Sequence, residues 1–103
     1  MINSYKLKIT KLAFEDMDQI FDYIAYELFN PVAAKDLLYE FEKAFKKICI
    51  FPLSFPNICN EYVKDKNLRK LAVKNYMVFY RIKGNEVQIT RVLYGMRQYE
   101  ILL

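Results

Sequence analysis

The sequence contains no histidine among its 103 residues, and it has only 2 Gly, 3 Pro and 2 Cys. Without histidine, any acid–base catalysis has to use Lys, Arg, Tyr or a carboxylate. So few glycines argue against a glycine-rich phosphate loop, and the small number of turn formers argues against an all-β sandwich. Two cysteines without histidine do not make a zinc site. These absences exclude several common classes of enzyme, and no metal or other cofactor is expected.

Long apolar runs are also missing, so the sequence predicts neither a signal peptide nor a membrane-spanning segment. Cys49 and Cys59 are therefore expected to be reduced, partly buried thiols of a cytoplasmic protein, rather than a disulfide. Apolar residues make up 54% of the chain and aromatic residues 17%. A chain of this length and composition predicts one domain, residues 1–103, with a single core.

The net charge of +4 hides an asymmetry along the chain. Residues 1–63 carry 7 Lys and 9 acidic residues, whereas residues 64–103 carry 9 Lys and Arg against 3 acidic residues. All the arginines lie in the second part. This distribution indicates a basic surface where a polyanion would dock, and the alternative is an ordinary soluble protein with one basic face.

The first half of the chain predicts one strand and two helices. Residues 5–10 alternate between apolar and polar, which is typical of a strand with one buried face. Thr10 then caps a first helix, and Glu15, Asp16 and Asp18 follow in its first turns, where the helix dipole favours negative charge. Asn30-Pro31 ends this helix and caps the next. Apolar residues recur at helical spacing through both, so the two helices are expected to form an antiparallel hairpin.

The second half predicts three strands after an irregular connection. Prolines 52 and 56 end the second helix, and residues 52–66 form a connection anchored by Phe55, Ile58 and Tyr62. Strands follow at 69–74, 76–83 and 86–94, with tight turns at residues 74–75 and 84–85. The order strand, helix, helix and three strands predicts an α+β fold. In it, an antiparallel two-helix hairpin packs on one face of a mainly antiparallel four-stranded sheet.

The face of the sheet away from the helices is expected to be partly open, with only a short C-terminal segment to cover it. The more polar alternating positions are assigned to this face: Lys70, Lys74, Gln88, Thr90 and Tyr94. Arg81 and Arg91 are then expected at sheet edges or paired with carboxylates from the helices.

Arginine and tyrosine are concentrated in this last third, and they suit an anionic polymer because guanidinium groups bind phosphate and aromatic rings stack on bases. The residues predicted to bind nucleic acid or another target are Arg69, Lys70, Lys74 and Arg91. If the protein is a nuclease, Arg81 and Arg97 would stabilise the phosphate and Tyr94 or Tyr99 would transfer a proton. In the structural alternative, the two tyrosines complete the core and Arg97 is solvated.

Three segments together resemble the RelE/ParE superfamily of bacterial toxins: KITKLAFEDMDQIFDYIAYELFNPVAAKDLLYEFEKAFKKICIFP, RKLAVKNYMVFYRI and VQITRVLYGMRQYEILL. The resemblance covers nearly the whole chain, in order. It implies the toxin of a type II toxin–antitoxin module, neutralised by a cognate antitoxin that wraps around the sheet and the helical hairpin. RelE-like members cut mRNA on the ribosome without a metal, whereas ParE-like members poison DNA gyrase and are not hydrolases. The nearly loopless hairpin and the RVLYGMRQYEILL ending favour the ParE-like group slightly.

Two departures weaken the nuclease interpretation. Several nucleases of the superfamily carry a histidine where this chain has Tyr94, and some carry a basic residue where it has Met77. A ribosome-dependent mRNA endoribonuclease nevertheless remains the alternative, because other members work with Lys, Arg and Tyr. A degenerate toxin that only binds antitoxin is a further alternative.

Other positions match the superfamily pattern. Arg69 and Lys70 match a basic pair that opens the second strand, Arg81 matches a frequent strand arginine, and Arg97 matches a basic residue after the final glycine. The resemblance implies that these residues meet the target, either ribosome-bound mRNA or gyrase, and no membrane partner is expected.

Overall fold

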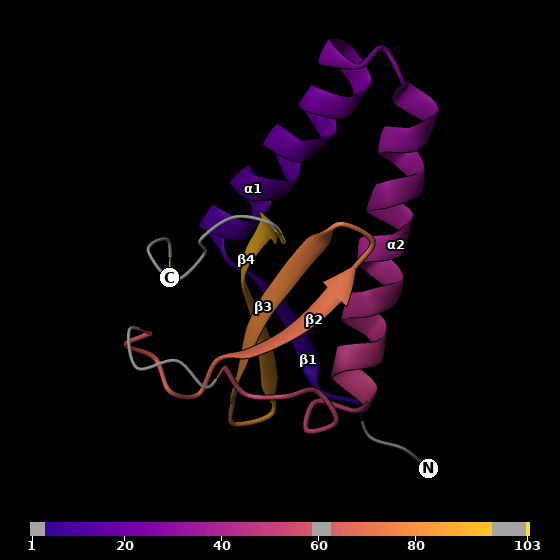
Figure 1. The fold of residues 1–103 in the computed structure, drawn as a ribbon. Helices are drawn as coiled ribbons and strands as arrows, with labels where there is room; N and C mark the ends of the chain where they lie inside the picture. Colours follow the sequence, from indigo (N-terminus) through magenta and orange to yellow (C-terminus); the bar gives the residue numbers. More distant parts are fainter. Residues whose placement is uncertain (1–3, 59–62, 96–102) are drawn as a thin grey trace.

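The computed structural model describes residues 4–58, 63–95 and 103. Its elements are β1 (Lys6–Ile9), α1 (Lys11–Asp22), a π-helical turn η1 (Tyr23–Glu27), α2 (Pro31–Ile50), β2 (Arg69–Val73), β3 (Tyr76–Lys83) and β4 (Glu86–Tyr94). The helices form a hairpin beside the sheet, and the tip of the hairpin extends beyond the end of the strands (Figure 1). No helix in the described ranges is both long and apolar enough to cross a membrane.

The sheet has the order β1-β4-β3-β2. β1 runs parallel to β4, whereas β4, β3 and β2 are joined as antiparallel neighbours. The predicted α+β architecture is therefore confirmed, and β1 and β2 are its two edge strands. Residues 74–75 and 84–85 form the predicted turns, with Lys74 and Gly84 both at positive φ.

The helix ends follow their capping residues. The Thr10 hydroxyl accepts the N–H of Ala13 at 3.2 Å, and the Asn30 side-chain oxygen accepts the N–H of Ala33 at 3.1 Å. Both predicted caps are confirmed. The first helix nevertheless changes after Asp22 to a π-helical turn over Tyr23–Glu27, which the sequence analysis did not predict.

The main core lies between the hairpin and one face of the sheet. Its large, fully buried members include Phe41 and Ile48 from α2 and Val78, Tyr80 and Ile89 from the sheet. The Tyr80 hydroxyl donates to the carbonyl of Pro52 at 2.6 Å, and burial raises the pKa of Tyr80 to about 12. Cys49 is a buried free thiol at the end of α2, and burial raises its pKa. The second cysteine, Cys59, lies outside the described residues.

The opposite face of the sheet is more covered than the sequence predicts. A second apolar cluster lies there: Ile58, Val63, Leu68, Phe79 and Leu93, with Met77 and Leu103 packed against it. The connection before β2 is held to that strand by backbone hydrogen bonds, from the Ile58 N–H to Leu68 and from the Lys70 N–H to Pro56. The sequence analysis expected this face to be partly open because it did not predict that the connection packs against it. Tyr62, which was also predicted to anchor the connection, lies outside the described residues.

A β-bulge in β4 changes which side chains share a face. Phe79 pairs with Arg91 and Tyr80 pairs with Ile89, so Thr90 is an extra residue on β4. The Thr90 hydroxyl donates to the Phe79 carbonyl at 3.2 Å. Since an extra residue reverses the alternation that follows it, Tyr94 is paired with Tyr76 on the side of the hairpin. The assignment of Tyr94 to the opposite face was wrong, because it assumed regular alternation.

Candidate functional site

By strand register, three of the predicted cationic residues belong to the sheet face away from the hairpin. Lys70, Phe79 and Arg91 stand opposite one another on β2, β3 and β4. Two strand spacings separate the first from the third, which is about 10 Å between their backbones. Arg81 follows two residues after Phe79 on β3 and so shares its face. Lys70, Arg81 and Arg91 are here called the basic face.

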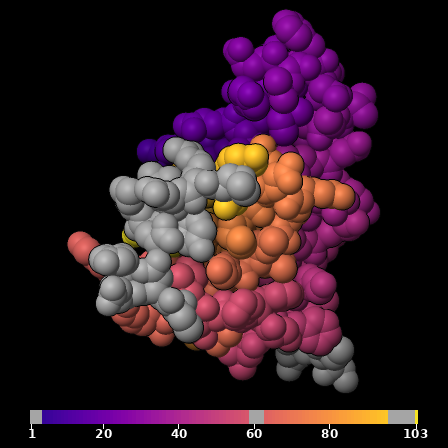
Figure 2. Space-filling view, viewed as in Figure 1, coloured from indigo at the N-terminus to yellow at the C-terminus, as the bar shows by residue number. Residues whose placement is uncertain are grey.

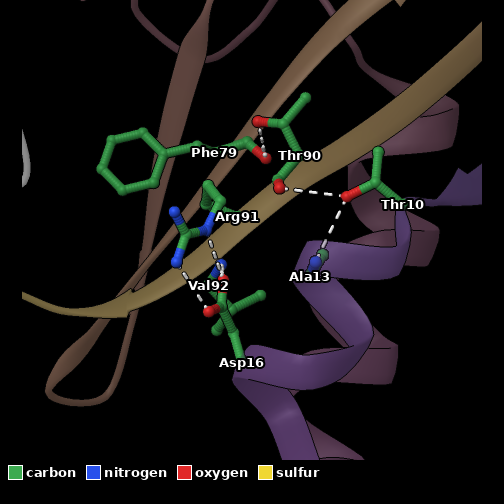
Figure 3. A network of polar contacts seen from close by, with 7 residues as sticks. All are labelled: Thr10, Ala13, Asp16, Phe79, Thr90, Arg91 and Val92. Carbon is green, nitrogen blue, oxygen red and sulfur yellow. Dashed lines mark hydrogen bonds and ion pairs between the residues drawn. The ribbon is translucent and has the colours of Figure 1, made fainter. Parts of the chain in front are cut away.

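Arg91 is bound by a carboxylate of α1 (Figure 3). Its Nε and Nη2 atoms each lie 2.8 Å from a carboxylate oxygen of Asp16, and the backbone N–H of Val92 donates to the same carboxylate at 3.0 Å. The hydrogen bond to Asp16 raises the pKa of Arg91, whereas burial opposes this increase. The expectation that Arg91 pairs with a helix carboxylate is confirmed, and the guanidinium is already occupied.

Asp16 itself was missed as a functional partner. The sequence analysis assigned it to the helix dipole, but its side chain is only 10% exposed and it reaches β4 rather than the helix terminus. β1 ends at Ile9, opposite Ile89, so β4 continues past the end of its neighbour and its N–H groups need another acceptor. The signal was present in the sequence, since Asp16 adjoins Met17 on the buried stripe of α1.

Arg81 belongs to a more exposed network. Its Nη1 lies 3.2 Å from Asp65, its Nε donates to the side-chain oxygen of Gln88 at 2.8 Å, and Gln88 donates to Glu86 at 2.7 Å. The Arg81 side chain is 44% exposed and that of Asp65 is 30% exposed. An ion pair this accessible contributes about 1 kcal/mol or less, so an incoming anion can replace Asp65.

The other predicted target-binding residues lie elsewhere. Arg69 is in register with Tyr80, and its Nη1 donates to the carbonyl of Phe55 at 2.6 Å. Lys74 is in the turn between β2 and β3, at the opposite end of β2. The structure therefore does not bring the four predicted target-binding residues into one surface.

The predicted catalytic residues are also separated where the structure describes them. Arg81 pairs with Gln88 near one end of β3, whereas Tyr94 pairs with Tyr76 at the other end. Five residues of strand separate the two positions, which is about 17 Å, and the two side chains lie on opposite faces. Arg97 and Tyr99 lie outside the described residues. Arg81 and Tyr94 are thus not placed to act on the same phosphodiester.

Tyr94 instead belongs to a group of tyrosines beneath the hairpin. Its ring lies edge-on to that of Tyr76, with centroids 5.7 Å apart. Burial raises the pKa of Tyr76, and the neighbouring phenols of Tyr94 and Tyr23 raise it further. Two cavities, of about 480 and 650 Å³, share Tyr23 and Tyr76 in their walls. We call these two adjoining cavities the tyrosine cleft, a feature that the sequence analysis did not predict.

A separate apolar groove lies between the edge strand β1 and the hairpin. It has a volume of about 440 Å³, and we call it the β1 groove. Its walls consist mainly of apolar side chains: Leu7, Ile9, Phe14, Met17, Leu38, Phe41 and Phe45. Asp18, Glu42 and Lys46 complete its lining. Leu7 and Phe14 are 45% and 52% exposed, so about half of each side chain is accessible to a partner.

Within the described ranges, no group of three or more His, Cys, Asp or Glu side chains is arranged to hold a metal ion.

The family profile of the ParE toxin of the type II toxin–antitoxin system parDE matches residues 7–99. The chain belongs to this family. The resemblance to the RelE/ParE superfamily is thereby confirmed, and the chain is a type II toxin–antitoxin toxin. The matched region of this ParE-family toxin contains every predicted site residue, including Arg97 and Tyr99.

Two solved structures share the fold of this ParE-family toxin. A chain from the chromosomal ParDE toxin–antitoxin system of P. aeruginosa is 24% identical, with a TM-score of 0.73 over 88% of this chain and 96% of that chain. A chain from the toxin–antitoxin complex RelBE2 of Mycobacterium tuberculosis is 20% identical, with a TM-score of 0.63 over 91% of this chain and 94% of that chain. At these identities the likeness shows the fold alone. A search of curated proteins finds no match.

Proposed function

We propose that this ParE-family toxin inhibits growth by binding DNA gyrase and is not a nuclease. The observation that carries the proposal is the separation of Arg81 from Tyr94 along β3 and across the sheet. Acid–base catalysis requires its groups within hydrogen-bond reach of one substrate, and these two are about 17 Å apart. The match to the ParE family rather than to a nuclease family supports the same choice.

The basic face is the proposed contact with the target. Arg81 is its most accessible arginine, and Asp65 is a replaceable partner for its Nη1. A phosphate of gyrase-bound DNA or a carboxylate of gyrase itself would take the place of Asp65. The guanidinium then exchanges Asp65 for an anion of the target while Gln88 continues to hold its Nε.

The alternative is an mRNA nuclease of the RelE type, and one observation favours it. Leu103 packs with Met77 on the cluster that lies on the same side of the sheet as Lys70 and Arg81. Leu103, which follows Arg97 and Tyr99 along the chain, therefore lies near the basic face. In this alternative, Arg97 and Tyr99 would supply the catalytic groups with Lys70 and Arg81.

We further propose that a cognate antitoxin occupies the β1 groove in the cytoplasm. The two similar structures come from toxin–antitoxin systems, which supports such a partner. β1 is an edge strand, and the N–H groups of Lys6 and Thr10 point to Asn85 and to β4. The alternate positions, Leu7 and Ile9, direct their backbone groups outward, where an extended segment with apolar side chains can pair and fill the groove.

Two assays, one with purified toxin and one on cells that express it, distinguish gyrase inhibition from mRNA cleavage. Supercoiling by purified gyrase is expected to fall with added toxin, and primer extension on cellular mRNA is expected to give no codon-register cuts. Arg81→Gln is expected to weaken the inhibition, whereas Lys35→Gln, the same charge change on α2, is expected to leave it unchanged. Cuts in the mRNA with unaffected supercoiling would replace the proposal with the nuclease, and inactivity in both assays would favour a degenerate toxin.

A further inference from the structure

The charge of the molecule is divided between the hairpin and the rest. Residues 15–42, which form the distal part of the hairpin, carry 8 acidic residues and 1 Lys. The remaining residues carry 15 Lys and Arg against 4 acidic residues. The distal hairpin therefore repels nucleic acid and attracts cationic protein surfaces. It also projects away from the rest of the molecule, which makes it accessible to a large partner (Figure 2).

Large side chains on this acidic region are exposed. Tyr23 and Tyr39 are 55% and 60% exposed, and Phe29 is 86% exposed. Phe29 also has a φ of 52°, a left-handed conformation that is unfavourable for a bulky residue. Exposed aromatic residues together with a strained tip indicate an interaction surface rather than a purely structural hairpin.

The tyrosine cleft is the concave part of this surface. It lies where the hairpin extends past the ends of β3 and β4, between η1, the first turns of α2 and the β2–β3 turn. The rings of Tyr23, Tyr76 and Tyr94 line it, and none of their hydroxyls hydrogen-bonds to another residue in the described chain. Aromatic faces with free hydroxyls beside an acidic element can hold a cationic side chain and accept its N–H groups.

Charged groups in the larger cavity set the preferred ligand. Asp36 is exposed and has no ion-pair partner in the part of the chain that the structure describes. Glu40 also lines the cavity and pairs at 3.3 Å with Lys43, whose side chain is 53% exposed. Lys74 lines the same cavity from the β2–β3 turn and opposes a cationic ligand. Because Glu40 is already paired, Asp36 is the carboxylate of this cavity that remains available to a cationic ligand.

We propose that the tyrosine cleft binds an arginine- or lysine-bearing segment of gyrase, separately from the basic face. This inference rests on the proposed gyrase target. The cationic side chain lies against the rings of Tyr23 and Tyr76 and reaches the carboxylate of Asp36. An enzyme that holds DNA presents many such side chains, because it must neutralise phosphates. The cleft and the β1 groove share no lining residue, so the antitoxin site and the cleft are distinct.

Direct binding of the purified toxin to purified gyrase tests this inference. Asp36→Lys is expected to weaken binding at least about tenfold, and Tyr23→Ala by about fivefold, from the lost charge attraction and ring contact. Asp22→Lys and Tyr26→Ala are the matched controls, because both residues are exposed on the same hairpin and neither lines the cleft. Both controls are expected to bind as the wild type does.

Lys74→Gln gives a second, opposite test. If the cleft holds a cation, removing this ammonium group strengthens gyrase binding by about twofold to threefold. If Lys74 instead contacts the target as a cation, the same change weakens binding. Circular dichroism and denaturation of each variant establish that it is folded before binding is compared.

The outcomes separate the two proposals. Wild-type toxin that does not bind gyrase would overturn the proposed function and this inference together. Wild-type binding that both cleft variants and both controls retain would overturn only the inference. Cleft variants that lose antitoxin binding but keep gyrase binding would overturn the choice of gyrase as the occupant.

Discussion

The carboxylate of Asp16 on α1 binds the guanidinium of Arg91 on β4 through both oxygens and also accepts the backbone N–H of Val92. One side chain therefore continues the edge pairing of β4 beyond the end of β1. It also fixes the position of an arginine that belongs, by register, to the basic face. The Asp16–Arg91 ion pair therefore both stabilises the fold and sets part of the charge of the proposed target contact.

Breaking the pair is expected to destabilise the fold. Asp16→Asn retains an acceptor for Val92 but removes the carboxylate charge that Arg91 binds, so the free energy of unfolding should fall by about 2–4 kcal/mol. Arg91→Met leaves the carboxylate uncompensated and should have a similar effect. The double variant should be destabilised by at least about 1 kcal/mol less than the sum of the singles. Chemical denaturation measures all three, and additive effects would contradict the coupling.

Tyr80 is expected to make the protein sensitive to alkali. Its pKa is raised to about 12 in the folded state, so above pH 10 the unfolded chain loses this proton while the folded chain keeps it. The raised pKa therefore contributes up to about 2 kcal/mol to the free energy of unfolding. This contribution is complete below pH 10 and is lost as the pH rises to about 12.

Tyr80→Phe provides the comparison for this pH dependence. It removes the hydrogen bond to Pro52 and should lower stability at pH 7 by about 1 kcal/mol. Denaturation from pH 8 to pH 12 should then show a smaller alkaline loss than in the wild type. Equal losses in both proteins would show that other groups cause the alkaline unfolding.

Asp65 is expected to limit the availability of Arg81. Asp65→Asn removes the carboxylate from Nη1, so a target anion no longer has to compete with it. If Arg81 contacts the target, inhibition of gyrase should become about twofold to fivefold stronger, in line with the energy of an exposed ion pair. The supercoiling assay measures this. Combined with Arg81→Gln, Asp65→Asn should have no effect, and a persistent gain would contradict the role of Arg81.

The β1 groove is expected to determine antitoxin affinity. Phe14→Asp places a charge on an apolar wall and should weaken antitoxin binding at least about tenfold. Leu12→Asp is the matched control, because Leu12 is 54% exposed on the same helix and does not line the groove. Gyrase inhibition should be unaffected in both variants. Isothermal titration of each variant with the cognate antitoxin measures the two affinities. Equal weakening in both variants would show that the antitoxin does not bind in the β1 groove.

Much of the fold follows from local signals in the sequence. Thr10 and Asn30 cap the helices as predicted, because a side-chain oxygen before an apolar stripe satisfies the first free N–H groups. The strands 76–83 and 86–94 also have their predicted bounds, because Gly84 provides the positive φ that the tight turn requires.

The misplaced features depend on contacts that no local pattern encodes. The sequence around Thr90 does not indicate a bulge. Both sets of alternating residues in β4 contain apolar side chains, so either set could face the core. The position of Tyr94 was wrong for this reason. The position of Asp16 beside the buried stripe of α1 indicates burial, but no local pattern identifies its partner Arg91, which is 75 residues away. Register places Lys70, Arg81 and Arg91 on one face of the sheet, a grouping that the sequence analysis did not make. The carboxylates that bind the two arginines, Asp65 and Asp16, come from other segments of the chain.

The parallel pairing of β1 with β4 joins the start of the described chain to its last strand, since Leu7 stands opposite Val87. Contacts of such long sequence separation form late and slowly. During translation, a nascent chain without residues 86–94 has an incomplete sheet, with neither the Asp16–Arg91 pair nor the finished β1 groove. The proposed target contact and the proposed antitoxin groove should therefore both become complete only after β4 has been made, so neither is expected to work in a shorter nascent chain.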